Sequence, residues 1–177
     1  MTHDEFQKRM EEKYPRMFSQ PYGGFAVGEG WYKIIEQLCA NIEHHEHSKR
    51  ARRSRDLRVA RARIKGRDAV LKYLVKDRTP SDWDHENADH IMQSNHTITE
   101  KDQRVVVAQI KEKFGGLRFY YEGGDDYIDG LVTMAESWAS RTCEKCGDDG
   151  HQRGGGWIRT LCDTHEAEYQ AKRAQHD

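Results

Sequence analysis

Apolar residues after position 30 repeat with the period of an α-helix. Six of them recur at i, i+3, i+4, i+7, i+8 and i+11, namely Trp31, Ile34, Ile35, Leu38, Cys39 and Ile42. This spacing places all six on one face of a helix, so it predicts an amphipathic helix over 31–43 with Cys39 as a buried core thiol. The preceding segment, "SQPYGGFAVGEG", is predicted to be a loop because its Pro and Gly residues discourage helix and strand alike.

A different pattern follows much later in the chain. The segment "VVVAQIKEKFGGLRFYYEG" places β-branched and aromatic residues on both sides of a Gly-Gly pair. It predicts a β-hairpin with strands 104–112 and 117–122 and a turn around Gly115–Gly116. Helical spacing then returns between Ile128 and Ala139. We therefore expect a second helix over 126–140, with Asp125 or Asp126 as its N-cap.

The segment between these two regions is polar. Scattered apolar residues permit one or two helices between 55 and 76, weakened in the middle by Gly66 and ended by Pro80. Residues 81–103 are predicted to be loop with at most a short helix. These patterns divide the chain into a core part at 1–43, a basic insertion at 44–103, and a module at 104–177 that holds the hairpin, a helix and a cysteine-rich end.

Composition limits the class of protein. With 177 residues, 36% apolar and 33% charged, the chain has enough residues for one domain with a small appendage and a lean core. No segment has the apolar stretch of a signal sequence, and none approaches the roughly 20 apolar residues that cross a bilayer. The sequence thus predicts a cytoplasmic protein without a membrane partner. In a reducing compartment, clustered cysteines indicate metal binding rather than disulfides.

Three of the four cysteines lie close to one histidine near the C-terminal end. Cys143 and Cys146 form C-x2-C, and Cys162 and His165 form C-x2-H fifteen residues later. Two such pairs supply four tetrahedral ligands for Zn²⁺ and leave no open position, which predicts a structural rather than a catalytic zinc. Gly147 allows a tight turn after the second cysteine.

The elements around these ligands predict a zinc finger. A turn, the hairpin suggested by "GGGWIRTLC", and a helix that begins near Cys162 resemble a treble clef, with Asp163 and Glu166 as a D-x-x-E capping signature. The predicted fold class is therefore α+β: helices packed on a β-hairpin, closed by a C-terminal treble-clef-like zinc finger.

The insertion carries most of the local positive charge. Residues 49–67 hold ten Lys and Arg against one acid, although the formal net charge of the chain is −1. Such a segment suits nucleic acid or an acidic protein. Alternatively, it is a solvated helix whose arginines pair with the chain's own acids. The candidate binding residues are Lys49, Arg50, Arg52, Arg53, Arg55, Arg58, Arg61 and Arg63. On a helix, arginines 50, 53, 58 and 61 are expected broadly on one side.

Histidines raise an enzymatic alternative. Asp89-His90, together with "LCDTHEAE", partly resembles the HNH nucleases, although the Asp-His pair precedes the cysteines instead of lying within the zinc element. That resemblance would imply a metal-dependent nuclease that uses the histidines of 84–96, namely His85, His90 and His96. The alternative is a polar surface loop. His44 and His47 could likewise meet on a helix and hold a second metal, or lie at a solvated helix end.

The hairpin and the zinc ligands resemble one recurrent group of proteins. "QIKEKFGGLRFYYEG", "AESWASRTCEKCG" and "GWIRTLCDTH" are similar to segments of small uncharacterised proteins from bacteriophages and bacteria, over about residues 104–166. The resemblance implies the fold and the zinc ligands, and it favours a phage accessory protein. Three functions are compatible with the sequence: contact with nucleic acid or a host protein that processes it, an HNH-like nuclease, and a protein-only inhibitor of a host or defence factor.

Overall fold

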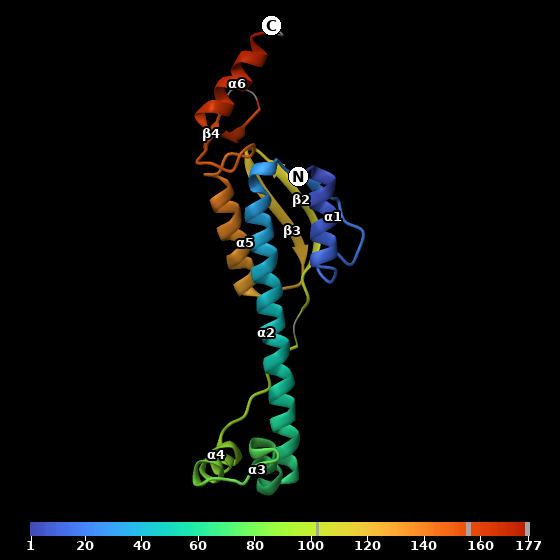
Figure 1. The fold of residues 1–177 in the computed structure, drawn as a ribbon, viewed down its shortest axis with the longest axis vertical. Helices are drawn as coiled ribbons and strands as arrows, with labels where there is room; N and C mark the ends of the chain where they lie inside the picture. The colour runs from blue at the N-terminus through green and yellow to red at the C-terminus, as the bar shows by residue number, and fades with distance from the viewer. Residues whose placement is uncertain (102, 155–156, 176–177) are drawn as a thin grey trace. The chain divides into compact units, whose positions relative to one another are not determined.

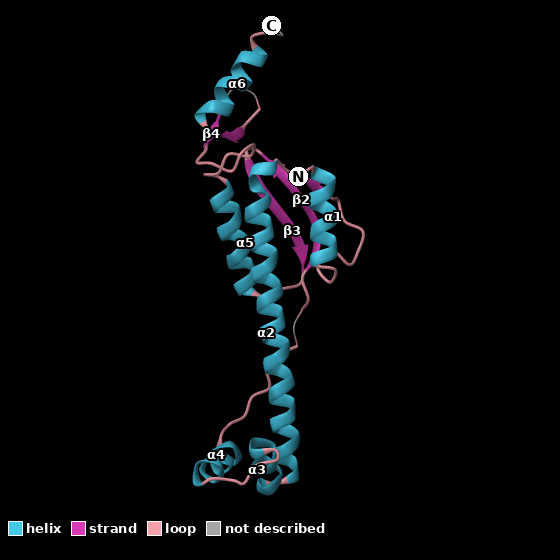
Figure 2. Cartoon of the chain, in the orientation of Figure 1, coloured by secondary structure: helices cyan, strands magenta, loops and turns pink. Residues whose placement is uncertain are grey.

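The chain forms two compact units, each with its own core. The computed structural model describes residues 1–101, 103–154 and 157–175. The first unit contains residues 1–44 and 103–177, and the second contains residues 45–102. Helices and strands both contribute, so the predicted mixture of helix and sheet is confirmed (Figures 1 and 2). None of the helices in the described ranges is both long and apolar enough to cross a bilayer.

The first unit is built on a three-stranded sheet. Strand β1 (Phe25–Ala26) pairs in parallel with β2 (Val106–Lys113), which pairs antiparallel with β3 (Gly116–Glu122). In the register, Ile110 faces both Phe25 and Phe119. The predicted hairpin is confirmed, with a shorter first strand. Its turn differs from the prediction, because the central residues are Phe114 and Gly115, both at positive φ, and Gly116 already belongs to β3.

Three helices share one core with this sheet. They are α1 (His3–Lys13), the first turns of α2 (Tyr32–Lys65), and α5 (Asp126–Ala139). Figure 1 shows α5 running beside the first turns of α2. The Phe6 ring of α1 stacks on Tyr32 of α2 with ring centroids 3.9 Å apart. Helix α5 covers the edge of β3, where the Phe119 N–H donates to the Glu136 carboxylate at 3.0 Å.

The helix ends follow from local sequence signals, some of which the sequence interpretation missed. The Asp125 side chain accepts from the Ile128 N–H and caps α5, as predicted. Helix α1 was not predicted. It begins with a capping box in which Thr2 accepts from Glu5 N–H while the Glu5 carboxylate accepts from Thr2 N–H.

Helix α2 is much longer than predicted. It begins at Tyr32, directly after a 3₁₀ turn at Glu29–Trp31, and it continues to Lys65 instead of ending at 43. The apolar stripe ends near Ile42, but the Arg, Ala and Lys residues that follow are good helix formers. Gly66 then ends the helix at φ +100°, a conformation that favours glycine.

The second unit is a small helical assembly. The end of α2 packs with α3 (Arg67–Val75) and α4 (Asp82–Gln93) around Ala62, Val70 and Ala88. Residues 81–103 were expected to be loop with at most a short helix, and the structure places the 12 residues of α4 there. This helix begins with a capping box in which Ser81 and Asp84 exchange hydrogen bonds, a signal that its polar composition obscured.

Two bidentate ion pairs support this small core. Arg67 binds Asp89 at 2.5 and 2.9 Å, and Arg78 binds the fully buried Asp84 at 2.6 Å through both of its terminal nitrogens. Hydrogen bonds from Arg78, followed by those from Ser81, hold the pKa of the Asp84 carboxyl well below its usual range. Charged groups therefore supply order where apolar area is limited.

Candidate metal centre

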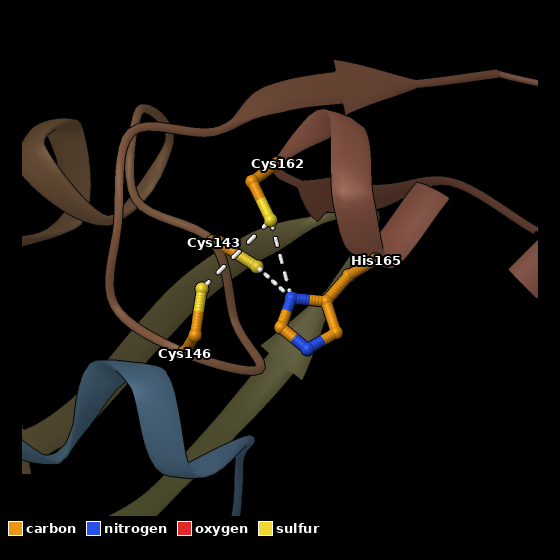
Figure 3. Close-up of side chains that lie close together, drawn as sticks. All are labelled: Cys143, Cys146, Cys162 and His165. Atoms are coloured by element: carbon orange, nitrogen blue, oxygen red, sulfur yellow. Dashed lines mark hydrogen bonds between the residues drawn. The ribbon is translucent and has the colours of Figure 1, made fainter. Parts of the chain in front are cut away.

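The four predicted ligands meet at one point of the first unit. Cys143 and Cys146 lie in the turn that follows α5, Cys162 is the N-cap of α6 (Asp163–Arg173), and His165 lies in the first turn of that helix. One ligand atom from each residue lies within 4.8 Å of all the others. Figure 3 shows the three sulfur atoms and the His165 ring pointing toward one another. This group is positioned to bind a metal ion.

The separations suit a tetrahedral ion. Metal–sulfur bonds of about 2.3 Å at tetrahedral angles separate two sulfurs by about 3.8 Å. The Sγ atoms of Cys146 and Cys162 are 3.8 Å apart, and Nδ1 of His165 lies 3.5 Å from Cys143 Sγ and 3.1 Å from Cys162 Sγ. Four protein ligands would fill such an ion's coordination. The site can hold a metal, but it offers no position for an activated water.

The loop around the first pair stabilises a thiolate at Cys143. Gly147 adopts φ +83°, as its place after Cys146 predicted, and donates its N–H to the Cys143 carbonyl at 2.9 Å. Burial raises the pKa of the Cys143 thiol, but backbone N–H groups of Cys162, Cys146 and Lys145 outweigh burial and lower it to about 7. One thiolate is therefore readily formed, and N–H donors stabilise its charge.

A segment from the other end of the chain closes over this loop. The buried Trp31 indole donates from Nε1 to the Thr142 carbonyl at 2.8 Å, and the Gly30 N–H donates to the Glu144 carbonyl at 3.0 Å. A Cβ on Gly30 would lie 2.1 Å from the Cys143 carbonyl oxygen, and one on Gly28 would lie 2.0 Å from that of Glu144. We call residues 28–31 the clasp.

The sequence interpretation assigned part of the clasp to a loop and Trp31 to a helix stripe. Its two glycines directly before a tryptophan were the available signal, because such spacing permits close backbone approach. The sequence around the clasp does not identify Thr142 as the partner of Trp31, because the two residues are 111 positions apart.

The second ligand pair is anchored to the hairpin of the central sheet. Strands β4 (His151–Arg153) and β5 (Arg159–Leu161) form a short antiparallel pair. The Thr160 hydroxyl donates to the Gly115 carbonyl at 2.6 Å, and the Thr160 carbonyl accepts from the Glu144 N–H at 2.9 Å. Fully buried Thr160 thus links the β2–β3 turn to the residue after the first ligand.

The predicted capping signature of α6 is wrong. Cys162 occupies the N-cap without a side-chain cap, so Asp163 is the first helical residue and cannot form a D-x-x-E box with Glu166. The Asp163 carboxylate instead binds Arg153 of β4 at 2.5 Å. The N-cap is therefore the candidate ligand Cys162, one residue before the expected Asp163.

The structure divides the arginines of α2 differently from the prediction. Arg50 binds the buried Glu46, Arg53 donates to the Thr99 carbonyl, and Arg63 donates to the carbonyls of Met92 and Ser94. Lys49 is partly buried. Arg50 and Arg53, two of the four arginines expected broadly on one side, thus bind groups of their own unit. The exposed arginines are Arg52, Arg55, Arg58 and Arg61.

The histidines that suggested a nuclease do not gather. His90 lies on α4, His85 contacts Arg67, and His96 contacts the Asp56 carbonyl at 3.0 Å. The Asp89 that precedes His90 is bound to Arg67. Within residues 1–101, 103–154 and 157–175, the cysteine-histidine group is the only cluster arranged to hold a metal, so His44 and His47 form no second one there.

Comparisons with known proteins found no relative of this chain. No family model, curated protein or solved structure matches the chain.

Proposed function

We propose that the four-ligand site holds a structural Zn²⁺ in a treble-clef-like finger. Three thiolates and one imidazole form a ligand set that Zn²⁺ accepts, and four ligands are typical of its structural sites. The order of elements also supports this proposal, since a turn with Cys143 and Cys146 is followed by the β4–β5 hairpin and then by α6, which carries His165. The metal would fix β5, and with it the contact between Thr160 and the β2–β3 turn.

We infer that the protein is a small zinc-stabilised binding protein that contacts nucleic acid, or a host protein that processes nucleic acid, through the Arg-rich segment. A phage or mobile-element origin is proposed only on the resemblance of the "KEKFGGLRFYYEG" hairpin and the ligand pairs. The observation that carries the function is the set of exposed arginines, which have no ion pair or side-chain hydrogen bond within the residues that the structure describes: Arg52, Arg55, Arg58 and Arg61.

A neighbouring cavity extends this basic surface. Arg58 lines a cavity of about 550 Å³ together with Lys72, Tyr73, Leu74 and Lys76 of the same unit. Three cationic side chains around one opening suit an anionic ligand, and a chain of phosphates would meet both the cavity and the exposed arginines. The lysines also lie at the end of α3, where cations offset the helix dipole.

Salt-dependent retention tests the function. The metal-loaded protein should be retained on heparin and should bind a DNA duplex at low salt. Alanine at 52, 55, 58 and 61 should abolish retention and reduce the salt slope by about one for each phosphate that is no longer neutralised. A matched control removes four exposed charges elsewhere, with Lys8, Arg16, Lys33 and Lys172 changed to alanine. Absence of wild-type binding at low salt, or an equal loss in both variants, would contradict the proposal.

A further inference from the structure

The tip of the β2–β3 hairpin exposes an aromatic residue in an unfavourable backbone conformation. Phe114 is the first central residue of the turn, with φ +54°, and its neighbour Gly115 has φ +74°. Two-residue hairpin turns with positive φ at both positions favour Asn-Gly, and a bulky L-residue rarely adopts such a φ. Nor does burial compensate for this conformation, since Phe114 is 67% exposed.

A second exposed aromatic residue lies beside Phe114. Trp157, two residues before β5, is 64% exposed, and both side chains line a cavity of about 450 Å³ with Lys113 and Ile158. Glu112 also lines it, but its carboxylate accepts from the Gly115 N–H at 2.6 Å. We call Lys113, Phe114, Trp157 and Ile158 the aromatic tip.

Strands β4 and β5, which lie between the two ligand pairs, contact the turn of the aromatic tip. Gln152 of β4 donates to the Phe114 carbonyl at 2.9 Å, and Thr160 of β5 donates to the Gly115 carbonyl. A Cβ on Gly115 would lie 3.0 Å from Ile158 Cγ2. The turn and the strand next to Trp157 are thus in close contact. The two aromatic residues therefore lie on segments that are in direct contact with each other.

Positive charge accompanies the exposed rings. The Lys113 ammonium lies 5.5 Å from the Phe114 ring centroid. On the same face of β2 and β3, Lys111 lies 5.1 Å from the ring of Tyr120, which is also exposed. Neither lysine has an ion pair among the residues that the structure describes. Lysines two residues apart on a strand lie about 7 Å from each other.

Exposed rings alternating with lysines match one class of ligand. Single-stranded nucleic acid offers flat bases that stack on aromatic side chains and phosphates that attract cations. A purely apolar peptide would gain nothing from Lys111 and Lys113, and a duplex hides its base faces. We propose that the aromatic tip, continued by Lys111 and Tyr120, binds single-stranded nucleic acid by base stacking. The proposal rests on nucleic acid being the partner, but it uses a surface separate from the Arg-rich segment.

The positive φ of Phe114 allows a substitution that removes its ring without destabilising the turn. Glycine suits φ +54° better than phenylalanine, so Phe114→Gly should fold at least as well as the wild type while it removes one stacking ring. Trp157→Ala removes the other ring. Trp138→Ala is the matched control, because Trp138 is 59% exposed on α5 and lies outside the aromatic tip.

Fluorescence anisotropy with a labelled oligo(dT) of about 15 nucleotides measures the effect on the metal-loaded full chain. Phe114→Gly and Trp157→Ala should each weaken binding about tenfold, whereas Trp138→Ala should not change it. Binding to a blunt duplex should be unchanged in all three variants. If both tip variants bind oligo(dT) like the wild type, the proposal is wrong. This holds also if the same variants lose the binding of an acidic peptide or protein.

The outcomes also separate this proposal from that of the Arg-rich segment. If removal of the four exposed arginines abolishes duplex binding and the tip variants bind oligo(dT) normally, only the proposal for the aromatic tip is wrong. If the tip variants lose oligo(dT) binding and the four-arginine variant binds the duplex like the wild type, only the proposal for the Arg-rich segment is wrong. If the wild type binds neither probe at low salt, both proposals fail.

Discussion

The indole of Trp31 and the carbonyl of Thr142 form a buried hydrogen bond of 2.8 Å next to the first metal ligand. Trp31 is fully buried, so no water can replace the donor if the indole is removed. The bond positions the backbone that leads into Cys143. A residue outside the candidate ligand set thus contacts the loop that carries the first candidate ligand.

Replacement of Trp31 by phenylalanine should lower both stability and metal affinity. It retains a large aromatic ring but leaves the Thr142 carbonyl without its donor, at a cost of about 1–3 kcal/mol in the free energy of unfolding. Denaturant unfolding of the metal-loaded protein and competition with a chromogenic chelator measure the two effects. Trp138→Phe, on an exposed side chain, should change neither; equal effects of the two substitutions would show that the hydrogen bond is unimportant.

Glycine at position 30 should be indispensable for the loop that carries Cys143 and Cys146, which we call the metal loop. A methyl group there would lie 2.1 Å from the Cys143 carbonyl oxygen and 2.6 Å from the Gly147 nitrogen, and these are backbone atoms that cannot rotate away. Gly30→Ala should therefore strongly reduce bound metal, as measured by elemental analysis of the purified protein.

The control for this substitution is Gly130→Ala on α5. Apart from the adjacent residues and backbone of α5 itself, no atom of the described residues lies within 4 Å of the added methyl group, and alanine is favoured in a helix interior by about 0.5–1 kcal/mol. It should retain the metal and raise the unfolding midpoint. A Gly30→Ala protein with a full complement of metal would show that the clasp tolerates displacement.

Metal content should depend on the cysteines of the centre and not on cysteine number. The wild type should contain about one zinc per chain, and Cys146→Ser should contain almost none, with partial unfolding of the C-terminal module. Cys39→Ala is the control, because Cys39 of α2 is fully buried in the core of the first unit and burial raises the pKa of its thiol. A folded wild-type protein without metal would contradict the site.

Acid should weaken the second unit through Asp84. Because Arg78 and Ser81 lower the pKa of this carboxyl in the folded state, it contributes stability above its unfolded pKa of about 3.9 and loses that contribution as pH falls below it. The protection of α3 and α4 amides against hydrogen exchange, relative to the intrinsic rate at each pH, should therefore fall below about pH 4. Asp84→Asn should accelerate exchange already at pH 7 and remove this acid response.

Asp89→Asn provides the comparison for Asp84. It breaks the other bidentate pair of the unit, but the Asp89 side chain is 49% exposed, whereas that of Asp84 is fully buried. Water screens the exposed pair, so its loss should cost much less. If both variants accelerate exchange equally, burial does not decide the importance of these pairs.

Local patterns predicted the elements and the ligands well. The apolar stripe after Trp31 identified the first turns of α2, and the spacing of Cys143, Cys146, Cys162 and His165 identified the group that the structure brings together. Both signals depend on residues within a few turns or one short module. The length of α2 was missed because its second half has helix-forming composition without an apolar stripe. Helix α4 was expected as at most a short helix without defined bounds, because its capping box lies in a polar segment.

Contacts between distant segments were not predictable in the same way. The clasp joins residues 28–31 to the loop around Cys143, and no periodicity in either segment indicates the other. The roles of Arg50, Arg53 and Arg63 also required the structure, because their partners are backbone carbonyls and a buried glutamate rather than an obvious run of acids. Charge counting alone could not separate them from the exposed arginines.

The clasp also has a consequence for the order of folding. The four ligands lie within residues 143–165, so a short loop suffices to bring them together, whereas the bond between Trp31 and Thr142 spans 111 positions. Contacts of long sequence separation carry a larger entropic cost of loop closure and form later. We expect the metal loop to assemble first and the N-terminal segment to close over it last. In kinetic terms, opening of the clasp would then be the step that admits a chelator to a folded protein.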